Sequence, residues 1–156
     1  MSLAQLDSII GKVDQTIETL ERNLPDHVRR AGLNAKELID SRITNTGLNA
    51  EGQSITNQFT GNVYSVDYAE FKKSKGRQVA YVDLQLTGDM WRNVGVEETV
   101  SGNEFKVTVQ PRNEENQKKM DDNARRYGPI LALSDEESAE IGDIFLQSII
   151  NDFEIL

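Results

Sequence analysis

Apolar residues recur at alternating steps of three and four near the start of the chain, from Leu3 to Leu24. This spacing is a heptad pattern, which places the apolar side chains on one stripe of an α-helix. It predicts a helix over about residues 3–23, roughly 30 Å long. Pro25 interrupts the pattern, and because proline is tolerated in the first turn of a helix, we expect a second helix to begin there. That helix should end before the turn-forming residues 44–47.

The apolar stripe can pack either on its own domain or on a neighbouring subunit. The expected sheet and the last helix carry apolar faces that can cover each other, and the second helix can cover only part of the stripe. Each buried apolar side chain contributes about 1.5–3 kcal/mol, so we expect some of the stripe, or the polar loop near it, to contact another subunit. The candidate interface residues on it are Leu3, Leu6, Ile10, Val13, Ile17 and Leu20.

The middle of the chain alternates between polar and strand-forming segments. Residues 44–62 are rich in Gly, Asn, Thr and Ser and predict a long loop. Residues 79–86 are rich in β-branched and aromatic residues, which favours a strand. Val82, Leu84 and Leu86 would lie on one face of that strand, because side chains alternate along it.

Two further runs predict a β-hairpin. Val94, Val96 and Val100 indicate one strand, and apolar residues alternate with polar ones over residues 105–109. Residues 101–103 have the composition of the connecting turn. The preceding Met90 and Trp91 should be at least partly buried, either against the sheet or at a subunit interface, and both are candidate interface residues.

The last third of the chain predicts two helices. Residues 113–127 form a polar helix that ends at Gly128-Pro129, and a short apolar connector follows. Ser134 and Glu137 have the spacing of a capping box at the start of the last helix, which is amphipathic. Together, the elements predict one α+β domain over residues 1–156. It should contain long N-terminal helices, a small antiparallel sheet with a β-hairpin, and two C-terminal helices packed on the sheet.

Composition narrows the classes of function. The 156 residues carry a formal net charge of −9, which opposes binding to nucleic acid unless the chain has a local basic patch. The one basic run contains Lys72, Lys73, Lys75 and Arg77, and it is either a solvated loop or a patch that faces an acidic neighbour or DNA phosphate. The chain has no cysteine, which excludes disulfides and thiolate metal sites and fits synthesis in a reducing cytoplasm. We expect neither a membrane span nor a signal peptide.

The sequence contains no group of residues with the spacing of a known catalytic site. Neither glycine-rich phosphate-binding pattern occurs in the chain. His27 is the only histidine, and the adjacent Asp26 cannot easily converge with it on one ion. Asp121 and Asp122 are neighbours on a polar helix, where adjacent side chains diverge by about 100°. We therefore expect no catalytic, cofactor-binding or metal-binding residues.

The order of short motifs along the chain carries more information than any one of them. A helical N-terminal third leads to the turn Thr46-Gly47-Leu48-Asn49-Ala50-Glu51-Gly52, and then to Tyr68 and the basic run. Leu86-Thr87-Gly88-Asp89-Met90 precedes the hairpin, Asn123-Ala124-Arg125-Arg126-Tyr127-Gly128 follows it, and Ile130-Leu131-Ala132-Leu133-Ser134-Asp135-Glu136-Glu137 leads into the last helix. Over roughly residues 26–150, this order resembles the tail-completion or virion-morphogenesis proteins of tailed bacteriophages, which join head to tail.

The resemblance implies a non-enzymatic virion protein that is assembled in the host cytoplasm. It would form a ring of about six subunits at the neck, contact other neck, connector and tail proteins, and let DNA pass without sequence-specific binding. An acidic wall suits such a passage because it repels phosphate. Two other functions remain open. One is a non-enzymatic adaptor or assembly chaperone that grips a partner through the N-terminal heptad helix, and the other is a small acid-dependent hydrolase with convergent carboxylates.

Overall fold

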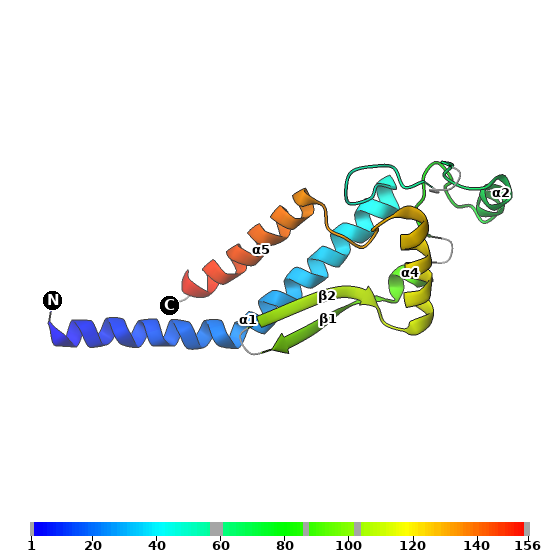
Figure 1. Ribbon diagram of the computed structural model, residues 1–156. Coiled ribbons are helices and arrows are strands. Elements are labelled where there is room, and N and C mark those ends of the chain that lie inside the picture. The colour runs from blue at the N-terminus through cyan, green and yellow to red at the C-terminus, as the bar shows by residue number, and fades with distance from the viewer. Residues whose placement is uncertain (1, 57–60, 86–87, 102–103, 155–156) are drawn as a thin grey trace.

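The computed structural model describes residues 2–56, 61–85, 88–101 and 104–154. Figure 1 shows a long helix whose C-terminal half lies between a second helix and a β-hairpin, while its N-terminal half extends beyond the rest of the fold. The α+β class and the long N-terminal helical region are confirmed. The elements, in chain order, are α1 (Leu3–Thr46), α2 (Val66–Ser74), α3 (Asp89–Arg92), β1 (Val94–Ser101), β2 (Glu104–Pro111), α4 (Glu114–Tyr127) and α5 (Asp135–Glu154).

The expected break at Pro25 is wrong, because α1 continues across it as one helix of 44 residues. Proline removes one backbone hydrogen bond and bends a helix, and the axis of α1 changes direction between its two halves (Figure 1). Contacts with α5 hold the two sides together. Asn23 Nδ2 and His27 Nε2 lie 3.1 and 2.8 Å from Oδ2 of Asp152. Asn23 and His27 are one turn apart, so a single carboxylate bridges the turn that contains Pro25.

Helix α1 also ends later than predicted, at Thr46 rather than before residue 44. The hydroxyls of Thr44 and Thr46 donate to the carbonyls of Asp40 and Arg42, one turn back, so these polar residues fit the last turn of the helix. Gly47 then stops the helix with φ of 66°, a left-handed conformation that favours glycine, and its N–H donates to the carbonyl of Ile43.

The predicted hairpin is confirmed. Strands β1 and β2 pair antiparallel from Val94 opposite Pro111 to Ser101 opposite Glu104, and the expected turn residues 102–103 lie outside the described residues. Both strands pack on α1, and α4 packs on β2. The buried core that joins these elements consists of Ile39, Ile43, Ile55, Val82, Trp91, Val94, Met120 and Ile130.

The predicted strand over residues 79–86 is wrong. Residues 79–85 have no regular secondary structure, and Leu86 lies outside the described residues. β-forming side chains need a partner strand, whereas here the side chain of Gln78 bonds the backbone of Ala80 and Tyr81. Leu84 has φ of 53°, which is incompatible with a strand. In the described part of the chain, the sheet is therefore the hairpin alone.

Both C-terminal helices form where the sequence predicts them. Helix α4 is capped by Asn113, whose side chain accepts from the N–H of Asn116. Helix α5 begins with the predicted capping box: the N–H of Glu137 donates to Ser134 Oγ at 3.1 Å, and the N–H of Ser134 donates to Glu137 Oε2 at 2.8 Å. Its place differs from the prediction, because α5 packs chiefly along α1 rather than on the sheet.

Replacing Ser134 with alanine should lower the free energy of unfolding by about 1 kcal/mol, because the N–H of Glu137 loses its acceptor. Chemical denaturation followed by circular dichroism measures this change. Ser138→Ala is the matched control, since Ser138 is exposed inside the same helix. Equal stability of the two variants would contradict the capping role.

Candidate functional site

The N-terminal half of α1 exposes the apolar side chains that the heptad pattern predicts. Leu3, Leu6, Ile10, Val13 and Ile17 are between 39% and 81% exposed, and Leu20 is partly buried. We call these six residues the N-terminal stripe. Ile9, which is 51% exposed, widens the stripe and was not among the predicted interface residues. The described part of the chain leaves most of the stripe exposed, as a subunit contact requires.

Of the other two predicted interface residues, Met90 and Trp91, the structure describes the side chain of Trp91 alone. Trp91, on α3, is 4% exposed and belongs to the core of its own chain. The structure therefore places Trp91 in the core of its own chain and not at a surface that a neighbouring subunit could contact. The side chain of Met90 lies outside the described residues.

The basic run divides into one buried and three exposed side chains. Lys73, Lys75 and Arg77 are exposed. Lys72 is 1% exposed, and its Nζ lies 2.5 Å from Oδ1 of Asp83. The prediction that Lys72 faces an acidic neighbour or DNA is therefore wrong, because its charge is already paired inside the fold. The exposed part of the patch is smaller by one cation than the sequence indicated.

The Lys72–Asp83 pair is the centre of a buried polar network between α2 and the segment that follows it. Tyr64 accepts a hydrogen bond from Lys72 Nζ at 2.9 Å and donates to Asp83 Oδ1 at 3.0 Å, and Gln78 Nε2 donates to Asp83 Oδ2 at 2.6 Å. Burial opposes ionisation of Asp83, but the hydrogen bonds from Lys72, Gln85 and Gln78 outweigh it and hold its pKa below the ordinary value. Burial raises the pKa of Tyr64. Every polar group here has a partner within the chain, which is typical of a structural network.

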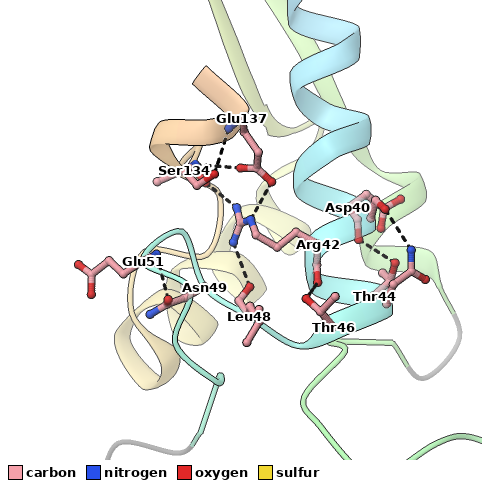
Figure 2. A network of polar contacts seen from close by, with 12 residues as sticks. Asp40, Arg42, Thr44, Thr46, Leu48, Asn49, Glu51, Ser134 and Glu137 are labelled. Carbon is pink, nitrogen blue, oxygen red and sulfur yellow. Dashed lines mark hydrogen bonds and ion pairs between the residues drawn. The ribbon is translucent and has the colours of Figure 1, made fainter. Parts of the chain in front are cut away.

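A second network, shown in Figure 2, joins three segments that are far apart in the sequence. Arg42 of α1 donates from Nε to Glu137 at 2.8 Å, from Nη1 to the Leu48 carbonyl at 3.0 Å and from Nη2 to the Ala132 carbonyl at 2.7 Å. Its guanidinium thus ties the turn after α1 and the connector before α5 to the same helix. These two segments also carry part of the resemblance described above.

An apolar groove lies beside the hairpin, with a volume of about 590 Å³. Helix α1 forms its floor, β2 forms one wall, and α5 with the connector before it forms the other. The residues that line it include Val28, Ala31, Ala35, Val107, Leu133, Ile141 and Phe145. Lys106, on the β2 rim, is the only charged residue in this lining. The sequence does not predict the groove, because its floor and its two walls come from separate parts of the chain.

Within the described ranges, no three His, Cys, Asp or Glu side chains are grouped to hold a metal ion. No described helix is long and apolar enough to cross a membrane. The geometry therefore defines the class of the molecule as an α+β protein with a projecting amphipathic helix and an apolar groove. The chain matches no family model, no curated protein and no solved structure.

Proposed function

We propose that this chain is a non-catalytic structural subunit of a tailed-phage neck, where copies of it form a ring that completes the tail and joins it to the head. The observation that carries the proposal is the N-terminal stripe. An exposed apolar stripe on a projecting helix is unfavourable in water and typical of a protein–protein contact. A subunit of a permanent assembly needs such a surface, whereas the two polar networks described above have their hydrogen-bond partners within the chain.

The placement of the resembling motifs also supports the proposal. Thr46-Gly47-Leu48 ends α1 with the left-handed Gly47, and residues 130–137 lead into the capped start of α5. Arg42 holds both segments. Motifs that are short and separated in the sequence thus form one structural unit, which is a physical reason for them to occur together.

Charge is consistent with this role. The net charge of −9 would repel DNA from most of the surface. The DNA could therefore pass through a ring of these subunits without being bound. The exposed cations Lys73, Lys75 and Arg77 remain available for an acidic neighbouring protein or for local contact with phosphate. The ring would have about six subunits by analogy with tail symmetry.

Electron microscopy of the purified protein should show rings, and the chain should co-purify with virions at low copy number. Replacing Val13 and Ile17 together with glutamate should abolish the rings, because it places charges in the stripe. Gln15→Glu, on the opposite face of the same helix, should leave them intact.

Rings that survive the Val13 and Ile17 double substitution would contradict a role for the stripe. Absence of the chain from purified virions would refute the neck role. If the chain also bound one partner protein through the stripe without forming rings, the adaptor function would replace the proposed one.

A further inference from the structure

The N-terminal stripe is flanked by charge on one side only. Asp7, Asp14 and Glu21 each directly follow a stripe residue, at intervals of seven, so they form one row along the helix. All three are exposed. The row on the other side of the stripe contains no charged residue: it consists of Ser2, Ile9, Thr16 and Asn23. A partner surface should therefore be apolar, with positive charge along one edge only.

This pattern argues against pairing of two N-terminal stripes with each other. In an antiparallel pair, equivalent flanking rows face each other, so Asp14 would lie near Asp14 of the second copy and Asp7 near Glu21. Like charges at such positions are destabilising. In a parallel pair, each acidic row would face an uncharged row, which supplies no attraction. The charges of the stripe thus favour a different surface as its partner.

The apolar groove has the complementary pattern. Its lining is apolar except for polar groups on β2, and its single charged residue is the cation Lys106 on one rim. The opposite wall, formed by α5, contributes Ile141 and Phe145. Farther along α5, Leu146, Ile150 and Phe153 are also exposed, by 57%, 46% and 53%. A helix placed in the groove with its acidic row toward β2 would therefore meet a cation on that side and apolar surface on the other.

The stripe cannot reach the groove of its own chain. Both belong to α1, which runs without a break from Leu3 to Thr46, and the groove floor begins at Val28. Figure 1 shows the N-terminal half of α1 directed away from the hairpin and from the C-terminal half. The stripe of this chain can therefore meet such a groove only on a second copy.

We propose that the N-terminal half of α1 of one copy lies in the apolar groove of the next copy, with its acidic row along the Lys106 rim. The contact is head-to-tail, because it joins two different surfaces, and such contacts repeat into closed rings or open filaments. This inference deepens the proposed function and rests on it for the assembly of like subunits. It assigns both the donor surface and the acceptor surface of that assembly.

Disulfide trapping tests the contact cleanly, because the chain contains no cysteine. Ile10→Cys, Val13→Cys and Ile17→Cys would each be mixed with a second full-length variant, Thr108→Cys, at a residue that lines the groove. After mild oxidation, at least one mixture should give a cross-linked dimer of the two different variants. Gln15→Cys, on the opposite face of the helix, should not cross-link to Thr108→Cys.

The other outcomes would either overturn the interface or separate it from the neck role. Disulfides within a single stripe variant, with none to Thr108→Cys, would show that stripes pair with each other. A protein that stays monomeric at all concentrations would show that the stripe binds something else. A mixed cross-link in a chain that is absent from virions would retain the interface and refute the neck role. A chain that is present in virions but gives no mixed cross-link would support the neck role and refute this interface.

Charge reversal at the rim supplies an independent measurement. Lys106→Glu should weaken self-association severalfold at low salt, because the acidic row would then face a carboxylate, and the difference should shrink as salt screens it. Lys118→Glu, an exposed site on α4, makes the same change in net charge away from the groove. Sedimentation that shows equal association for both variants would contradict the predicted orientation.

Discussion

Replacing Lys72 with methionine should lower the free energy of unfolding by about 3–5 kcal/mol, the usual cost of removing one member of a buried ion pair. Lys72 is 1% exposed and Asp83 is 6% exposed, so neither charge is solvated. Methionine can fill much of the space of the lysine stem but cannot donate to Asp83 or Tyr64. The carboxylate would then be buried without its cation. Denaturant titration followed by Trp91 fluorescence measures the loss, because Trp91 is the only tryptophan and lies in the core.

Lys73→Met is the matched control for this substitution. Lys73 is the next residue in α2 and is exposed, so its replacement should change stability by no more than about 0.5 kcal/mol. Adding Asp83→Leu to Lys72→Met should recover part of the loss, because it removes the unpaired charge. If Lys72→Met were as stable as Lys73→Met, the pair would not contribute as described.

Acid sensitivity should change in the same variant. In the native chain the pKa of Asp83 lies below its ordinary value of 3.8. Its contribution to stability is therefore present above about pH 4 and is lost as the pH falls through the lowered pKa. Without Lys72, burial is opposed by fewer hydrogen bonds, so the carboxyl should take up its proton at a higher pH. When the free energy of unfolding is measured at decreasing pH, it should begin to fall at a higher pH for Lys72→Met than for the native chain.

Replacing Gly32 with alanine should lower the free energy of unfolding by about 1–3 kcal/mol, although alanine is the better helix former. A Cβ at this position would lie 2.2 Å from Cγ1 of Val107 and 2.8 Å from Cγ1 of Val96. Both valines belong to the hairpin, so the hairpin would have to move away from α1. The glycine is therefore required for close packing rather than for a turn.

Gly11→Ala is the control, because Gly11 lies on the same helix with no other side chain within 4 Å of the new Cβ. It should be neutral or stabilise the helix by about 0.5–1 kcal/mol. Thermal unfolding of the two variants should thus change in opposite directions. A Gly32→Ala protein as stable as Gly11→Ala would contradict the close contact between α1 and the hairpin.

Local patterns were sufficient to predict several elements of the fold. The alternation over residues 105–109 predicted β2, and the capping residues Ser134 and Glu137 predicted the start of α5. The heptad steps predicted the N-terminal stripe, and its exposure agrees with a surface that its own domain does not cover. In each case the signal comes from residues within one or two turns or along one strand, so it can be read without knowing the fold.

Tertiary structure decided the features that depend on distant residues. Pro25 predicted a break, but Asp152 of α5 bridges the turn around it. Residues 79–86 predicted a strand, but strand propensity cannot supply a partner strand, and residues 79–85 lack one. Lys72 belongs to a basic run that reads as solvated, and only the fold places Asp83 beside it. The groove likewise exists only where three separate segments meet. The sequence by itself therefore determined the hairpin, the C-terminal helices and the apolar stripe, whereas the packing of distant segments determined which charges are buried and where the apolar groove forms.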